Sequence, residues 1–202
     1  MKKVKIAVFV SGSGTNLQAL IDAEKAGKLP SCELALVVSS NSHAKAIQRA
    51  EAAGIPARVN SKKRYPDVDV RTEKLNELLK EYEIDMIVLA GYLGIIRRET
   101  FDLYEGRIIN IHPSLIPSFC GVGYYGKLVH EAVLARGVKV TGATVHRVTL
   151  GVDEGEILMQ KAVDVMPGDT PDTLQLRVME QAEWVILPAA TEMIANQILK
   201  EL

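Results

Sequence analysis

The chain has 202 residues, of which 48% are hydrophobic and 24% are charged, a balance typical of a globular protein with a sizeable core. Its formal net charge of −1 gives no reason to expect a nucleic acid or an anionic membrane as a partner. The longest apolar run, 86–96, is too short to span a bilayer, and Cys32 and Cys120 match neither a metal nor a redox motif, so we expect free thiols in a cytoplasmic protein.

Strand-like and helix-like segments alternate along the first half of the chain. Short apolar runs predict strands over 4–10, 34–38, 57–59, 86–90 and 107–111. Apolar side chains at helical spacing predict helices over 16–26, 44–53 and 70–82. Repeated strand–helix units predict a mostly parallel sheet with helices on both faces, and therefore an α/β fold.

The pattern changes in the second half. Two strands, 138–148 and 157–165, are separated by a loop too short for a helix, which predicts an antiparallel pair. A helical segment over 172–199 follows, with an expected bend at Pro188. Because no linker or repeat interrupts this order, we expect one domain with a mixed sheet.

The segment 11–16, Ser-Gly-Ser-Gly-Thr-Asn, joins the first predicted strand to the first predicted helix. Glycines let the backbone approach a ligand, and a helix N-terminus offers free N–H groups, so a phosphate is the expected guest. Leu17 stands where a GxGxxG motif would need glycine, and no P-loop is present. A tight turn with a helix cap is the alternative, but the carboxyl end of a strand favours a ligand site.

Asn110 and His112 lie two residues apart at the end of a predicted strand, so their side chains point to the same face. An Asn amide can donate to an oxyanion, and a His can move a proton near neutral pH. A structural histidine is the alternative. Downstream, Asp153 lies in a loop rich in acids and glycine, and it could orient an imidazolium or simply belong to a solvated turn.

Four segments together resemble the folate-dependent phosphoribosylglycinamide formyltransferases of purine synthesis. They are SGSGTN at 11–16, VLAGYLGII at 88–96, IINIHPSLIP at 108–117, and GATVHRV at 142–148 with the following DEG. The resemblance implies a Rossmann-like formyltransferase fold, with 1–202 as a single formyltransferase domain. Its phosphate-binding half would cover about 1–105 and its catalytic half about 106–202.

The resemblance also implies the reaction. The formyl group of 10-formyltetrahydrofolate, the co-substrate, would pass to the amine of glycinamide ribonucleotide through a tetrahedral intermediate. In this sequence Asn110 matches the family's oxyanion donor, His112 its proton carrier and Asp153 its charge-balancing carboxylate. Because a carboxylate favours the protonated form of a neighbouring imidazole, we expect His112 to act partly as a cation. No metal is expected.

Further site residues follow from the resemblance alone. The phosphate of the ribonucleotide is expected at Gly14, Thr15 and Asn16. The folate is expected at Leu93, Gly94, Ile95, Ile96 and Asn110. His146 and Ser114 are expected to support the site. A family Glu that contacts the ribonucleotide maps to Ala182 or Glu183 across one inserted residue, and Glu183 is our choice.

The sequence departs from the family at Gly94, where an Arg is common, and in the loop 119–126, which replaces a His-containing stretch. Another folate-dependent formyltransferase or hydrolase with a different substrate is one alternative, although we expect no room for its extra domain before Val4 or after Leu187. A nucleotide-binding module without catalysis is the other. We expect small-molecule partners, no nucleic acid and no membrane, and either a monomer or a homodimer.

Overall fold

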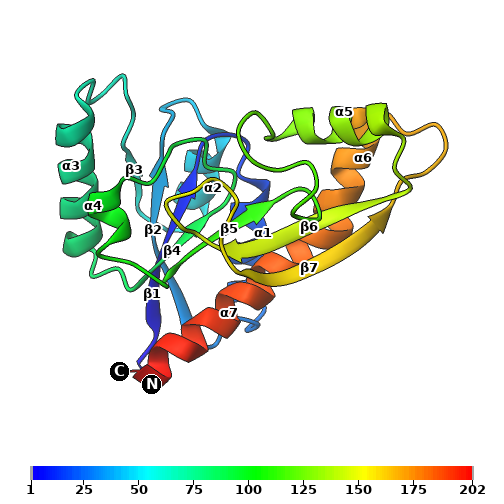
Figure 1. Ribbon diagram of the computed structural model, residues 1–202. Helices are drawn as coiled ribbons and strands as arrows, with labels where there is room; N and C mark the ends of the chain where they lie inside the picture. Colours follow the sequence, from blue (N-terminus) through cyan, green and yellow to red (C-terminus); the bar gives the residue numbers. More distant parts are fainter. Residues whose placement is uncertain (1, 202) are drawn as a thin grey trace.

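The computed structural model describes residues 2–201 and contains one seven-stranded sheet with helices on both faces (Figure 1). The strands lie in the order β3-β2-β1-β4-β5-β6-β7. Their bounds are β1 Val4–Val10, β2 Cys32–Ser39, β3 Ala57–Val59, β4 Met86–Leu89, β5 Ile108–His112, β6 Val140–Arg147 and β7 Ile157–Asp164. The helices are α1 Thr15–Lys25, α2 Lys45–Ala52, α3 Val68–Glu81, α4 Arg98–Phe101, α5 Lys127–Arg136, α6 Pro171–Val178 and α7 Trp184–Glu201.

The strands β1 to β5 run parallel to one another, whereas β6 is antiparallel to both β5 and β7. The predicted fold class, a mostly parallel sheet with antiparallel strands in the second half, is therefore confirmed. The two cysteines are free, as predicted.

The core has two layers because side chains alternate across each strand. In β1, Val8 and Val10 pack on one face with residues of α1, α2 and α7, whereas Ala7 and Phe9 pack on the other face with residues of α3. All four of these side chains are fully buried. A helix layer on each face explains why β1 is apolar at nearly every position instead of at every second one.

The strand order reverses between β1 and β4, which lie side by side although α1 and α3 cover opposite faces. At such a reversal, the loops that leave the two strands diverge and open a crevice at the carboxyl edge of the sheet. The loops after β1, β4 and β5 all leave from this edge because the three strands are parallel. The predicted site residues of these loops therefore lie at one edge of the sheet.

Two helices were not predicted. The helix α4 is a single turn, and α5 has three buried positions, Val129, His130 and Val133, one of which is polar. A histidine at a buried position interrupts the apolar spacing from which helices are predicted.

The closing helical segment is also more complex than predicted. Between α6 and α7, the five residues Met179–Glu183 form a π-helical turn, and α7 then continues through Pro188. A π turn absorbs one extra residue in an otherwise regular helix. The segment therefore has an irregularity before Pro188 that the sequence did not predict, and the bend at Pro188 stays a prediction.

Candidate active site

Asn110 and His146 lie directly opposite each other on the antiparallel strands β5 and β6. Nδ2 of Asn110 is 3.1 Å from Nε2 of His146, and Nδ1 of His146 is 2.8 Å from the carbonyl oxygen of Arg147. A carbonyl only accepts, so Nδ1 carries a proton, and Nε2 accepts from Asn110 because an amide nitrogen only donates. His146 thus holds the amide of Asn110 with its nitrogen turned toward the ring.

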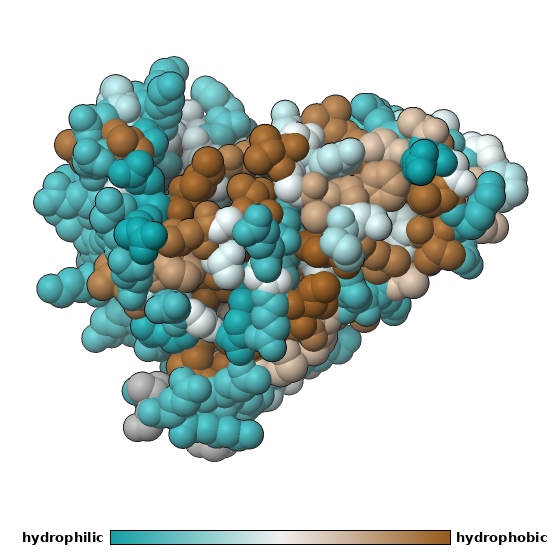
Figure 2. Space-filling view, viewed as in Figure 1, coloured by the Kyte–Doolittle hydropathy of each residue, from teal (hydrophilic) through white to brown (hydrophobic). Residues whose placement is uncertain are grey.

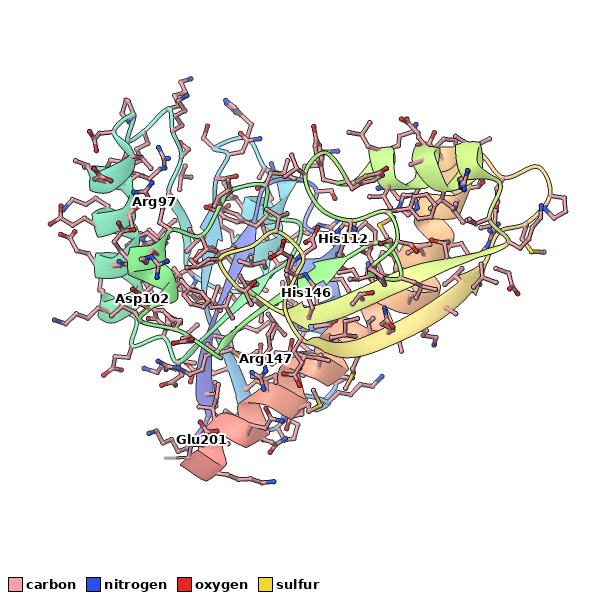
Figure 3. The ribbon with its side chains drawn as sticks, in the orientation of Figure 1. Arg97, Asp102, His112, His146, Arg147 and Glu201 are labelled. Carbon is pink, nitrogen blue, oxygen red and sulfur yellow. The ribbon has the colours of Figure 1, made fainter. Side chains whose placement is uncertain are left out.

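Asp153 lies between two histidines. Its Oδ2 is 3.6 Å from Nδ1 of His112, and its Oδ1 is 3.5 Å from Nε2 of His146. Its backbone has a φ of 58°, a left-handed conformation in which Asp and Asn are enriched. The N–H of Gly121 donates to Oδ2 at 2.9 Å. The structure therefore brings together all three residues that the sequence predicted as catalytic, and Figure 3 shows His112 and His146 near each other.

His112 has a second partner besides Asp153. Its Nε2 is 2.9 Å from the carbonyl oxygen of Phe119, so Nε2 carries the proton and the bare Nδ1 faces the carboxylate. If Nδ1 gained a proton, the imidazolium would find an acceptor on both sides. This arrangement suits a ring that is neutral at rest and charged during a reaction.

The charge of His112 before a substrate binds depends on its burial and on its two partners, whereas its role as a cation during the reaction stays a prediction. Burial of the ring lowers the pKa of His112 below its ordinary value, and this effect outweighs the Phe119 carbonyl and Asp153, which both raise it. For Asp153, burial raises the pKa, but contacts with His146, the Gly121 N–H and His112 together leave it below its ordinary value. A neutral imidazole therefore faces an ionised carboxylate.

Hydrogen bonds of Ser114 and Thr144 hold the loop after β5 in place. Ser114 is fully buried, and its Oγ donates to the carbonyl of Ser118 at 2.6 Å. Thr144, which pairs with His112 across the sheet, donates to the carbonyl of Ser114 at 2.7 Å and accepts from the N–H of Ile116 at 3.1 Å. These bonds fix the backbone on which His112 stands. Thr144 was not predicted from the sequence because only the strand register indicates its contact with this loop.

A cavity of about 260 Å³ opens at the glycine loop. Its lining contains the predicted residues Gly14, Thr15, Asn16 and Glu183, and also Leu93 from the loop after β4. The helix α1 has no side-chain cap and no acid in its first turn, so its N-terminus is available to an anion. Gly14 has a φ of 73°, and a Cβ there would lie 2.6 Å from Cβ of Ala46. This glycine is thus required where the loop crosses α2.

Glu183 reaches this cavity from the π-helical turn. It is 6% exposed, whereas its alternative, Ala182, is fully buried in the core. Burial raises the pKa of Glu183 to about 7, although the nearby Asn16 side chain lowers it. The π turn therefore turns the acid, and not the neighbouring alanine, toward the glycine loop.

A second cavity, of about 150 Å³, has the predicted folate stretch on one side. Gly94, Ile95 and Ile96 line it together with Asn110 and Asp153. The structure separates Leu93 from this group, because Leu93 lines the glycine-loop cavity and its N–H donates to Ser11 Oγ at 2.8 Å.

In its present position, the ring of Tyr92 lies so close to Gly94 that only glycine fits at position 94. A Cβ at Gly94 would lie 2.5 Å from the end of the Tyr92 ring, which packs edge-on against Phe9 at 5.3 Å between ring centroids. The tyrosine ring thus occupies the space that a side chain at position 94 would need.

The end of β5 separates the two cavities. Asn110 lines the smaller one, and its neighbours Ile111 and Pro113 line the larger one. Figure 2 shows hydrophobic residues gathered on this face, over the loops that follow β4, β5 and β6.

Two other hollows are larger than the cavities at the glycine loop and at the predicted folate stretch. One, of about 810 Å³, lies beside α3, and the other, of about 680 Å³, lies between α1 and α7, but neither includes the three predicted catalytic residues. The two larger hollows therefore lie apart from the predicted catalytic residues.

Two further observations bear on the kind of site. The described part of the chain contains no group of three or more His, Cys, Asp or Glu side chains placed to hold a metal ion. None of the helices among residues 2–201 combines the length and hydropathy that a bilayer crossing requires.

Comparison with known proteins adds independent findings. Residues 4–191 match the formyl transferase family model. The structure is similar to glycinamide ribonucleotide transformylase 1 from Symbiobacterium toebii, with a TM-score of 0.89 and 39% identity over 96% of this chain and 89% of that one. It is also similar to phosphoribosylglycinamide formyltransferase from Bacillus halodurans, with a TM-score of 0.86 and 39% identity over 94% of each chain.

Among curated proteins, the trifunctional purine biosynthetic protein adenosine-3 of Gallus gallus is 43% identical over 194 residues. The match covers 96% of this chain but only 19% of that protein, so the chain spans about a fifth of this relative's length.

Proposed function

The chain belongs to the formyl transferase family, among the phosphoribosylglycinamide formyltransferases, and from this membership we propose that it transfers a formyl group from 10-formyltetrahydrofolate to the amine of glycinamide ribonucleotide. One observation carries the proposal at the level of the site. Asn110 and His112 lie at the end of β5, and Asp153, in the loop after β6, lies beside His112. Asn110 and Asp153 line the cavity of the predicted folate stretch, and Ile111 on β5 and Pro113 directly after it line the cavity suited to a phosphate. Two substrates held in these cavities would meet at the three residues.

Asn110 serves as the oxyanion donor in this proposal. One N–H of its amide donates to Nε2 of His146, which leaves the second N–H free to stabilise the negative oxygen of the tetrahedral intermediate. His146 acts as a positioning residue, because a ring with its proton on Nδ1 keeps the amide nitrogen in place. Ser114 contributes by holding the loop after β5.

His112 takes up the proton that the attacking amine loses, and this proton then passes to the folate nitrogen, whose bond to the formyl carbon breaks as the tetrahedral intermediate collapses. The neutral resting ring is suited to this step, and the resulting imidazolium would donate to the Phe119 carbonyl from Nε2 and to Asp153 from Nδ1. Asp153 stabilises the charged ring and needs no proton of its own. Whether the proton passes directly or through a bound water does not alter these roles.

The two substrates fit the residues on either side. The N–H groups at the start of α1, with Thr15 and Asn16, suit a phosphate. The smaller cavity combines apolar side chains, such as Ile95 and Ile96, with peptide groups around Gly94, which suits a flat heteroaromatic ring with hydrogen-bonding edges. Of the residues predicted to bind the folate, Gly94, Ile95, Ile96 and Asn110 line the smaller cavity, whereas Leu93 lines the glycine-loop cavity.

The alternative that has no catalysis makes a different prediction. A nucleotide-binding module would keep the glycine loop but would not need Asn110, His112 or Asp153. The test mixes the protein with 10-formyltetrahydrofolate and glycinamide ribonucleotide and follows the change in folate absorbance. Turnover that His112→Ala abolishes, and that the exposed His43→Ala retains, supports the proposal. No turnover at any enzyme concentration refutes it.

The proposal also covers the compartment, the oligomeric state and the partners of the protein. We place the enzyme in the cytoplasm as a monomer or a homodimer, with one domain over 1–202 and with small-molecule partners in place of nucleic acid or membrane. Purine synthesis is the process in which such a reaction belongs, and the curated relative of Gallus gallus is named for it.

A further inference from the structure

His130 is a buried polar residue that the proposed mechanism does not use. It lies on α5, it is 1% exposed, and its Nδ1 has no hydrogen-bond partner among the described residues. On folding, a nitrogen of this kind loses its hydrogen bond to water without gaining another. Such an atom needs a functional explanation because buried polar groups are nearly always paired.

Packing does not provide that explanation. The other two buried positions of α5 are Val129 and Val133, both apolar. An apolar side chain at position 130 would fill the same space without an unpaired nitrogen. The histidine therefore serves something other than the core.

The ring of His130 lines the glycine-loop cavity, together with Thr15 and Asn16. Among the described residues that line this cavity, none is a Lys or an Arg. A phosphate held at the start of α1 would thus depend on uncharged donors, and His130 provides a ring nitrogen that has no other partner. Glu183, the carboxyl group in the lining, cannot donate to a phosphate once it is ionised.

We infer that His130 is a substrate-binding residue whose Nδ1 donates a hydrogen bond to the phosphate of the ribonucleotide. This inference rests on the proposed function, and it adds a contact from α5 to those of the glycine loop. Burial and the neighbouring His112 lower the pKa of His130 to about 4, so the ring is neutral near pH 7 and donates as an N–H group. A neutral ring carries a single proton, and we place it on Nδ1, the buried nitrogen that lacks a partner.

The test uses three variants that separate the two ring nitrogens. His130→Asn places an amide near the position of Nδ1, His130→Gln places one near Nε2, and His130→Phe keeps only the ring shape. Affinities for glycinamide ribonucleotide and for ribose 5-phosphate are measured by calorimetry, and KM for 10-formyltetrahydrofolate by steady-state kinetics. His43→Asn, at an exposed position, is the control.

The expected loss in His130→Phe is about tenfold in affinity for both phosphate ligands, the scale of one hydrogen bond to a charged group. His130→Gln should behave like the Phe variant, and His130→Asn should stay within about threefold of the parent, while KM for the folate changes less than about twofold. If the Phe variant does not fold, the Asn and Gln variants still decide the matter.

Unchanged affinity in a folded His130→Phe, or equal affinities in the Asn and Gln variants, overturns the inference. A loss for glycinamide ribonucleotide without a loss for ribose 5-phosphate overturns the phosphate assignment. If the parent protein binds ribose 5-phosphate but catalyses no formyl transfer, the proposed function fails, while the contact from His130 is still decided by the ribose 5-phosphate data.

Discussion

Oδ2 of Asp153 lies 3.6 Å from Nδ1 of His112. This separation is slightly longer than a hydrogen bond, which is what a bare ring nitrogen facing a carboxylate oxygen requires, because both atoms carry lone pairs. The pair is therefore arranged for the charged state of the ring and not for its resting state. A substitution at Asp153 should accordingly affect the reaction more than the fold.

Asp153→Asn tests the carboxylate. Asn tolerates the left-handed backbone at this position, and its side-chain oxygen can still accept from the Gly121 N–H. Only the charge is lost, so we expect kcat to fall by about two to four orders of magnitude, with small changes in both KM values, as measured in the absorbance assay. Glu154→Gln, in the same loop and exposed, should retain the parent kcat. A near-normal rate in Asp153→Asn would remove Asp153 from the mechanism.

The pKa of His112 is a second measure of the same pair. In the parent protein it should lie below 6.5 because burial disfavours the charged ring. Asp153 raises this pKa, so Asp153→Asn should lower it further. An NMR titration of the ring signals in the free protein measures both values. A pKa that rises in Asp153→Asn would mean that the carboxylate does not stabilise the imidazolium.

The three predicted catalytic residues were not equally predictable from the sequence. The side-by-side placement of Asn110 and His112 follows from the alternation of side chains on a strand. The contact of Asn110 with His146 depends on the register between β5 and β6, and the place of Asp153 depends on a hairpin loop with an unusual backbone conformation. Spacing along the chain shows neither register nor loop conformation.

The residues that line the glycine-loop cavity also differ in how well the sequence predicts them. The glycine loop was predicted because its position after β1 and its composition both indicate a ligand. His130 was missed because a single histidine in a helix resembles an ordinary surface residue until its burial is known. Glu183 could be assigned only through resemblance, since the π-helical turn that directs it into the cavity leaves no periodic mark in the sequence.

Gly14→Ala tests the close packing of the glycine loop. Alanine would have to adopt a φ of 73°, and its Cβ would lie 2.6 Å from Cβ of Ala46. The left-handed backbone costs about 1–2 kcal/mol, and the clash with α2 adds to it. A loss of at least roughly 2 kcal/mol should lower Tm by about 4–8 °C in a chain of this size, as measured by calorimetry.

Gly12→Ala is the matched control for this substitution. A Cβ at Gly12 would meet no heavy atom within 4 Å, and this glycine does not have a positive φ. The stability of Gly12→Ala should therefore stay within about 1 kcal/mol of the parent. Equal Tm values for the two variants would show that the loop yields freely and that the contact with α2 is unimportant.

Glu183→Gln tests the buried acid through the pH dependence of stability. Burial raises the pKa of Glu183 from 4.5 to about 7 in the folded protein. A group with a raised folded pKa contributes stability below its unfolded pKa, and this contribution is lost as the pH rises from about 4.5 through about 7. A shift of this size corresponds to roughly 3 kcal/mol.

Glutamine cannot ionise, so Glu183→Gln should lack this loss. We expect the difference in unfolding free energy between pH 5 and pH 8 to be smaller in the variant than in the parent by up to roughly 3 kcal/mol, as measured by urea unfolding without ligand. Contributions from all other groups cancel in this comparison. Glu180→Gln, an exposed acid of the same π-helical turn, should leave the pH dependence unchanged. If Glu183→Gln also leaves it unchanged, the carboxyl group is solvated in solution and does not face a dry cavity.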